Sequence, residues 1–288
     1  MATGAARMFF AALGLATLVV AGATASATAE PVQIKPSLLR LNAKLELPEG
    51  KTEADGVAIL LHGTLSHHRQ ETIAALQQNL KARGIGTLAI TLSLGIDDRQ
   101  GPRACDVLHD YALAGVRREL ILWLAWLGGH GAKSIDLIGF SRGGAEIASV
   151  VRELTPVRKV VLVAPAFTSS DDLAEAYQRS FGQPLGPRLE AARAAPLVQS
   201  TVDFLLCRQA PVLGATFLDG YRELPARLAA ETGRPTLVVI AGKDEIVRDL
   251  GTRLPSDVPR VTIDGAGHFF PDLYGEDAAD AIAKFLKE

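Results

Sequence analysis

One serine of the sequence stands in a setting that is typical of an enzyme nucleophile. Ser141 is the central residue of Gly139-Phe140-Ser141-Arg142-Gly143, which fits the pattern G-x-S-x-G. An apolar run precedes this segment, and small residues followed by aliphatic ones come after it. The pattern predicts a buried strand, a strained turn that carries Ser141, and the start of a helix, which is the geometry of a nucleophile elbow.

Two later loops contain the groups that a serine nucleophile needs. Asp244 follows the apolar run 237–241, and His268 comes shortly after the apolar segment 261–263. A histidine can accept the proton of the serine hydroxyl, and a carboxylate can orient the histidine. We therefore predict a catalytic triad in which Ser141 is the nucleophile, His268 acts as base and then as acid, and Asp244 orients His268.

Several other carboxylates could take the place of Asp244. One is its neighbour, one lies four residues before His268, and two follow the apolar run 160–163. The position of Asp244 in the first turn after a strand favours it over these alternatives. The alternatives are Asp171, Asp172, Glu245 and Asp264.

The elements that must position these residues can be read from the apolar pattern. Continuous apolar runs of four or five residues are typical of strands that are covered on both faces. Longer amphipathic segments between them predict helices, so the chain alternates strands and helices and predicts a doubly wound, mostly parallel sheet. The alternating segment 41–47 predicts a half-buried edge strand. The predicted central strands are 57–61, 88–92, 135–138, 160–163 and 237–241, and the predicted helices are 73–82, 113–127 and 277–286.

Over residues 32–288 the chain resembles the α/β-hydrolase fold superfamily, in particular its serine esterases, thioesterases and aminopeptidase-like members. Four motifs carry the resemblance. Each follows a predicted strand, and their order along the chain is the order found in that superfamily. They are Leu60-Leu61-His62-Gly63, the elbow at Ser141, Asp244 in a G-x-D-x-x-V turn, and His268 in a G-H loop.

The resemblance also implies an oxyanion hole, built from backbone N–H groups. Arg142, which follows the nucleophile, and Thr64, which follows the His62-Gly63 pair, would supply the donors, with Leu65 as the alternative second donor. The side chain of His62 would support the loop by hydrogen bonding. His109 and His130, in contrast, are expected to be solvated or locally paired.

The regular alternation stops between about residues 166 and 232, where the superfamily inserts its cap. Helix-prone segments at 173–181, 188–198, 202–206 and 217–228 predict a helical cap on a single domain that spans residues 30–288. A cap shields the acyl intermediate from water and shapes the substrate pocket, although most of its apolar residues are expected to pack against other parts of the protein. The apolar residues considered are Phe181, Leu197, Phe204, Leu206, Leu213 and Phe217.

A cluster of polar residues is expected in the loops at the carboxyl ends of the strands. These residues either border the substrate entrance and favour polar or anionic compounds, or form a solvated loop face, which is the interpretation we favour. The residues are His67, His68, Arg69, Asp97, Asp98, Arg99, Arg103 and Arg142.

The N-terminus predicts export. Arg7 precedes an apolar stretch at 8–20 that is too short to span a membrane, and Ala27 and Ala29 are the small residues required for cleavage before Glu30. Residues 1–29 are therefore predicted to be a signal peptide, with an uncleaved anchor as the alternative. A periplasmic or secreted protein without a stable membrane anchor is expected.

The two cysteines and the charge balance narrow the class of protein further. In an oxidising compartment Cys105 and Cys207 are expected to form a disulfide, while two buried thiols are the alternative. With 30 Lys and Arg against 32 Asp and Glu, the chain has no basic character for nucleic acid. The adjacent His67 and His68 lack the partners of a metal site, so neither metal nor organic cofactor is expected.

These patterns together predict an exported serine hydrolase that acts on a small-molecule acyl substrate. An ester, thioester or amide would be cleaved through an acyl-enzyme on Ser141, and a carboxylic ester is the favoured bond. Two alternatives use the same scaffold differently. The first is non-hydrolytic acyl transfer or lyase chemistry, and the second is a binding or accessory protein without turnover.

Overall fold

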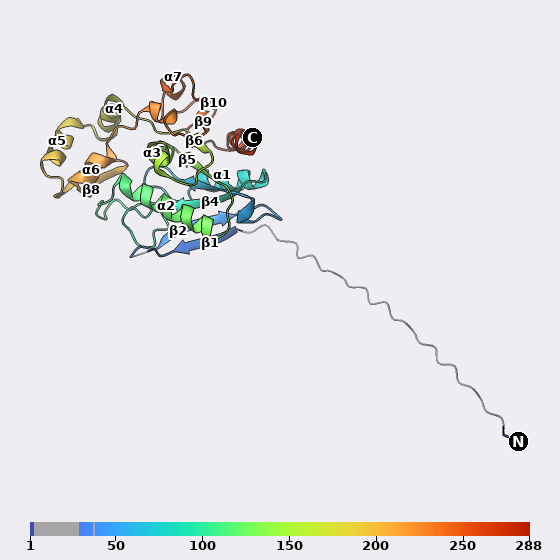
Figure 1. Ribbon diagram of the computed structural model, residues 1–288. Helices are drawn as coiled ribbons and strands as arrows, with labels where there is room; N and C mark the ends of the chain where they lie inside the picture. The colour runs from blue at the N-terminus through green and yellow to red at the C-terminus, as the bar shows by residue number, and fades with distance from the viewer. Residues whose placement is uncertain (3–28, 37) are drawn as a thin grey trace.

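A computed structural model describes residues 1–2, 29–36 and 38–288 and places eight strands in one twisted sheet (Figure 1). The first two strands in the sheet order run antiparallel to their neighbours, and the remaining neighbours are parallel. In spatial order the strands are β1 (Ala29–Ile34), β2 (Leu41–Glu46), β4 (Gly86–Thr91), β3 (Val57–Leu61), β5 (Ile135–Phe140), β6 (Val160–Val163), β9 (Thr236–Ala241) and β10 (Arg260–Ile263).

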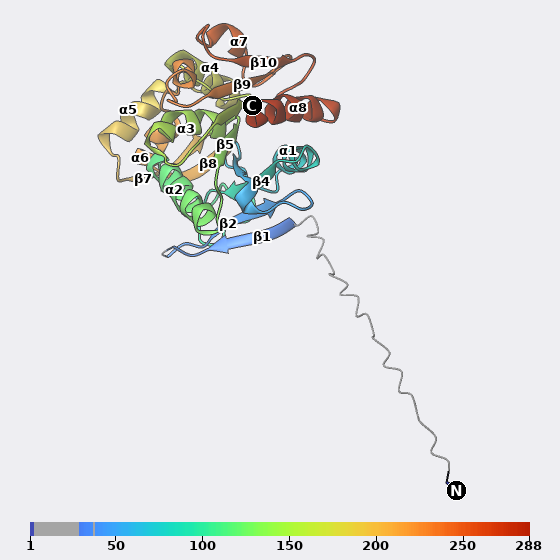
Figure 2. The same cartoon turned by 45° about the vertical axis from the view of Figure 1, so that its right-hand side comes forward.

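Helices cover both faces of this sheet, as the continuous apolar runs predict. Alternate residues of a strand point to opposite faces, so Ile59 and Leu61 pack on one side while Ala58 and Leu60 pack on the other. The first side is covered by α2 (Leu113–Gly129), α3 (Arg142–Val150) and α7 (Leu250–Arg253). The second is covered by α1 (Glu71–Ala82) and α8 (Leu273–Lys287), which lie side by side in Figure 2. Short 3-10 helices occur at η1 (Glu53–Asp55) and η2 (Val151–Glu153).

The prediction that residues 41–47 form an edge strand is wrong. β2 lies inside the sheet, because β1 pairs with its outer side in the register Val32 with Ala43. The side chains of Val32 and Ile34 are partly buried against the core, and this short alternation was the available sequence signal for the additional strand.

The insertion between β6 and β9 forms a cap of mixed structure. Its two ends meet at its base, where Thr168 donates to the carbonyl oxygen of Leu224 at 2.7 Å and Leu224 donates back at 3.1 Å. The insertion therefore leaves and rejoins the sheet at one place. Its elements are α4 (Ser170–Phe181), α5 (Gly186–Ala194), β7 (Gln199–Phe204), β8 (Cys207–Leu213), α6 (Gly214–Gly220) and η3 (Ala226–Ala229).

Part of the cap differs from the helical prediction. Residues 202–206 belong to the hairpin of β7 and β8, and the helix expected at 217–228 ends at Gly220. Phe204, Ala210 and Val212 of the hairpin are buried in the core of the cap. This packing on one side of the hairpin outweighs the local helical propensity.

The predicted signal peptide falls almost entirely on residues 3–28, which lie outside the described part of the chain, so it stays a prediction. Within the described ranges, no helix is both long enough and apolar enough to cross a membrane.

Candidate active site

Ser141 lies at the sharp turn between β5 and α3, with the backbone angles φ 54° and ψ −124°. A positive φ is strained for a residue with a side chain, and strain of this kind is typical of functional positions. The turn is possible because glycines surround it. A Cβ atom at Gly143 would collide with the carbonyl oxygen of His62, and one at Gly139 would lie 2.6 Å from Cα of Gly144. The small residues of the motif thus allow α3 to pack directly against β3 and β5.

The structure brings Ser141, His268 and Asp244 into one hydrogen-bonded chain. Nε2 of His268 lies 2.9 Å from Oγ of Ser141, and Nδ1 of His268 lies 2.8 Å from Oδ2 of Asp244. Because the Asp244 carboxylate only accepts, Nδ1 carries the ring proton and leaves Nε2 to accept the serine proton. His268 and Ser141 are both buried, so only a small part of this triad is exposed to solvent.

The carboxylate of Asp244 is fixed by the loop that carries it. Its Oδ1 atom accepts the backbone N–H groups of Ile246 at 2.9 Å and Val247 at 2.7 Å. The side chain of Asp244 is almost fully buried. The carboxylate therefore reaches His268 in a single orientation.

The alternative acids have other partners or lie at the surface. Glu245 accepts the backbone N–H of His268 at 3.1 Å, so it contacts the main chain of that residue and not the ring. Asp172 caps the start of α4 and pairs with Arg253 at 2.9 Å. Asp171 and Asp264 are exposed.

The predicted oxyanion residues lie next to Ser141. Gly63 is so close that an added Cβ atom would be 3.2 Å from Cβ of Ser141. Thr64 and Leu65 border the same cavity as Ser141, so both remain candidates for the second donor. Arg142 is the first residue of α3, where a backbone N–H has no partner within the helix.

The side chain of His62 supports the loop that carries Gly63, Thr64 and Leu65. Its Nδ1 atom donates to the carbonyl oxygen of Gly63 at 2.8 Å, and its Nε2 atom accepts the backbone N–H of Leu92 at 3.2 Å. Burial, together with the positive charge of Arg99, lowers the pKa of His62 to about 3. The ring is therefore neutral and joins the end of β3 to the end of β4.

Arg99, which was expected only as one member of a polar loop cluster, is buried beside His62. Its Nη2 atom lies 3.3 Å from Nε2 of His62, while Nε and Nη1 donate to the carbonyl oxygens of Leu92 and Gly101, each at 2.6 Å. An arginine in a polar loop carries no local pattern that predicts such burial. Only its tertiary contacts identify it.

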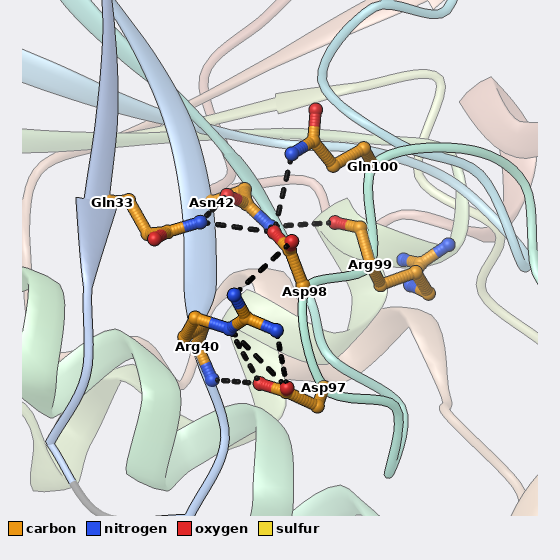
Figure 3. A network of polar contacts seen from close by, with 7 residues as sticks. All are labelled: Gln33, Arg40, Asn42, Asp97, Asp98, Arg99 and Gln100. Carbon is orange, nitrogen blue, oxygen red and sulfur yellow. Dashed lines mark hydrogen bonds and ion pairs between the residues drawn. The ribbon is translucent and has the colours of Figure 1, made fainter.

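A polar network at the edge of the sheet holds the loop that contains Arg99 (Figure 3). Arg40 of this edge pairs with Asp97 at 2.7 Å. Asp98 accepts hydrogen bonds from Gln33 of β1 at 2.9 Å and from Asn42 of β2 at 3.0 Å. β1 and β2 therefore hold in place the loop whose Arg99 contacts His62.

A cavity of about 480 Å³ opens onto Ser141 and His268. Its walls come from residues 63–67, which we name the oxyanion loop after its predicted role, and from the loop around residue 103, the tip of the β7–β8 hairpin and the segments near Asp244 and His268. Cys105 and Cys207 form a disulfide, and both line this cavity. The disulfide thus ties the cap hairpin to the body of the protein at the wall of the site.

The polar entrance, which was the alternative to a solvated loop face, is largely absent. Of the eight residues considered, only His67 and Arg103 line the cavity. Arg142 directs its side chain to Glu146 at 2.8 Å and to the carbonyl oxygen of Gly220 at 2.9 Å, so it joins α3 to the cap. The others lie outside the cavity, but the solvated loop face that we favoured is also wrong in part, because His68 and Arg99 are buried.

Of the apolar cap residues considered in the sequence, only Leu206 lines the cavity. Phe204 and Phe217 are buried within the cap, and Leu197 is exposed. Of the two expectations for His109, local pairing is correct, because its ring is buried against Phe204 and bonds to Tyr111 at 3.2 Å. Among the described residues, no group of three or more His, Cys, Asp or Glu side chains is placed to hold a metal ion.

A family profile described as "Alpha/beta hydrolase family" matches residues 58–285, so the chain belongs to the alpha/beta hydrolase family. No curated protein sequence matches it.

Solved structures share the fold at low sequence identity. Est1E from Butyrivibrio proteoclasticus with ferulic acid bound is 19% identical with a TM-score of 0.66, over 89% of this chain and 98% of that one. The esterase Pf2001 of Pyrococcus furiosus is 17% identical with a TM-score of 0.60, over 91% of each chain. The hydrolase GrgF from Penicillium sp. sh18 is 14% identical with a TM-score of 0.62, over 90% and 98%.

Proposed function

We propose that the protein is a serine hydrolase that cleaves carboxylic esters through an acyl-enzyme on Ser141. The observation that carries this proposal is the hydrogen-bonded chain from Ser141 through His268 to Asp244 at a cavity large enough for a small molecule. The esterase Pf2001 of Pyrococcus furiosus, which shares the fold, supports the choice of bond.

In the first half of the reaction, Oγ of Ser141 attacks the ester carbonyl carbon while Nε2 of His268 takes the hydroxyl proton. The carbonyl oxygen becomes an oxyanion that accepts the backbone N–H groups of Arg142 and of Thr64 or Leu65. The bond to the alcohol oxygen then breaks, and His268 returns the proton to that oxygen. The alcohol leaves, and the acyl group stays on Ser141.

In the second half, water takes the place of the alcohol. His268 removes a proton from the water, whose oxygen attacks the acyl carbon, and the bond to Ser141 breaks as its oxygen regains the proton. Asp244 stabilises the imidazolium in both halves, since its carboxylate remains bonded to Nδ1. Acyl transfer would use the same acyl-enzyme with another acceptor. A protein that only binds a ligand would not need the hydrogen bonds that join Ser141, His268 and Asp244.

We also propose that the protein is exported, with cleavage before Glu30. The disulfide between Cys105 and Cys207 supports an oxidising compartment. The first described strand begins at Ala29, so cleavage there leaves all but one residue of β1 in the mature chain. N-terminal sequencing of the exported protein should find Glu30 or a residue next to it, and retention of Met1 would contradict the proposal.

Labelling with a fluorophosphonate tests the enzymatic proposal directly, because this reagent reacts with an activated serine. The folded parent protein should be labelled at Ser141 and should hydrolyse p-nitrophenyl acetate, and Ser141→Ala should do neither. A parent protein that is folded yet neither labels nor hydrolyses would refute the proposal.

A further inference from the structure

The cavity at Ser141 has mainly apolar walls. Leu65 and Pro102 lie on the side of the oxyanion loop, and Phe140 follows from β5 beside the nucleophile. The disulfide adds two sulfur atoms to the wall. His67, Gln70 and Arg103 also line the cavity, but most of the exposed wall is apolar and suits a hydrocarbon group.

Three large apolar side chains of this cavity are exposed to solvent. Leu206 at the tip of the cap hairpin is 72% exposed, Ile246 is 53% exposed and Phe269 is 47% exposed. They come from three separate segments of the chain and meet around one opening. Exposed apolar groups that gather in this way mark a binding surface, because contact with an apolar ligand removes them from water.

The charged side chain on the cavity wall is positive. Among the described residues that line it, none is an Asp or a Glu, whereas Arg103 is one of them. Arg103 is only 4% exposed, and its Nε and Nη1 atoms have no hydrogen-bond partner within the described structure. A substrate with a positive charge in its acyl group would therefore lose its hydration next to a cation and find no carboxylate on the wall, because the nearby Asp244 and Glu245 are already bonded to His268.

We infer that the site takes esters whose acyl group is apolar and free of positive charge, and that Leu206 helps to select this group. The inference rests on the proposed function and makes it narrower. Aminoacyl compounds, whose amine is positively charged, are excluded. The leaving alcohol must lie near His268 to receive its proton, so the acyl group extends toward Leu65 and the hairpin tip.

Two p-nitrophenyl esters of the same shape test the effect of charge. One carries a 6,6-dimethylheptanoyl group, and the other carries a 5-(trimethylammonio)pentanoyl group, in which nitrogen replaces the quaternary carbon. We expect kcat/KM to be at least about 100-fold higher for the neutral ester. For unbranched esters, kcat/KM should rise about four-fold with each methylene that becomes buried, from acetyl upward until the cavity is filled.

The role of Leu206 is tested by placing a carboxylate at its position. In Leu206→Asp, the ratio of kcat/KM for the neutral ester to kcat/KM for the charged ester should fall by about ten-fold or more. The reason is that the charged acyl group can then pair with the introduced carboxylate. Leu197→Asp is the matched control, since Leu197 is a cap leucine that is 85% exposed and does not line the cavity. This control should leave the ratio unchanged.

A binding measurement separates this inference from the proposed function. Calorimetry with Ser141→Ala and the benzyl amides of the two acyl groups reports the preference of the cavity without turnover, and the neutral amide should bind more tightly. The inference would be overturned if the two acyl groups gave the same kcat/KM and the same affinity with a protein that is labelled by the fluorophosphonate and hydrolyses p-nitrophenyl acetate. The proposed function would then remain intact. An equal change of the ratio in Leu206→Asp and Leu197→Asp would overturn the role of Leu206.

Discussion

Arg99 and His62 lie in contact beneath the oxyanion loop, with 3.3 Å between Nη2 and Nε2. Burial lowers the pKa of Arg99 to about 10, so the guanidinium remains charged at neutral pH. A charged donor on Nε2 keeps the ring proton on Nδ1, where it bonds to Gly63. Arg99 therefore acts through His62 on the backbone that carries Thr64 and Leu65.

Replacement of Arg99 should affect the transition state more than substrate binding. We expect Arg99→Ala to lower kcat by about 10- to 100-fold with little change in KM, because complete removal of an oxyanion donor costs about 100- to 1,000-fold and displacement of one costs less. Affinity for a trifluoromethyl ketone should fall in parallel, and Arg99→Lys should restore part of both. Arg193→Ala, at an exposed cap position, is the control. A rise in KM alone would contradict this positioning role.

Asp244 and Glu245 provide a matched pair of neighbouring acids. Asp244→Asn should lower kcat by about 10⁴-fold, because the imidazolium loses its stabilising charge. Glu245→Gln should have a small effect, since the amide oxygen can still accept the backbone N–H of His268. Steady-state kinetics on p-nitrophenyl acetate measures both. Equal losses would show that the wrong acid has been chosen.

Gly143 and Gly128 should respond in opposite ways to substitution by alanine. At Gly143 the added Cβ atom collides with the His62 carbonyl oxygen, so Gly143→Ala should reduce stability by more than about 2 kcal/mol and disturb the oxyanion loop. At Gly128, in α2, nothing lies within 4 Å. Gly128→Ala should therefore stabilise the protein by up to about 1 kcal/mol. Urea unfolding of both variants measures the difference.

The disulfide should contribute substantially to stability. It joins residues separated by 102 positions, so its loss increases the entropy of the unfolded chain by an amount equivalent to about 4 to 5 kcal/mol at most. We expect the double variant Cys105→Ser with Cys207→Ser to melt at a lower temperature in calorimetry. The parent protein with reductant should approach the same melting temperature. An unchanged melting temperature in both cases would show that the disulfide adds no stability.

Acid should destabilise the protein through His62. The pKa of His62 is lowered to about 3, below its ordinary value of 6.5, so between these two pH values the unfolded chain binds a proton that the folded chain does not. The free energy of unfolding therefore falls as the pH falls from 6.5 to 3, by up to about 5 kcal/mol from this residue. Urea unfolding at several pH values should give a shallower dependence for His62→Gln than for the parent. His130→Gln, at an exposed histidine, should keep the parent slope.

The sequence alone determined the features that depend on local pattern. Apolar runs indicated the central strands, because a strand buried on both faces needs apolar residues at successive positions. The glycines around Ser141 indicated a turn that no larger residue can form. The positions of Asp244 and His268 after strands predicted that they would meet Ser141, since the carboxyl ends of parallel strands share one edge of the sheet.

Only the tertiary structure decided which other side chains reach the site. Arg99 and His62 are 37 positions apart, and no periodicity in the sequence connects them. Leu206 borders the cavity because the cap segment forms a hairpin, whose strands are stabilised by the burial of Phe204 against the rest of the cap. β1 occupies the sheet edge because β2 offers its outer side for pairing. These contacts depend on the packing of distant segments, which local propensity does not encode.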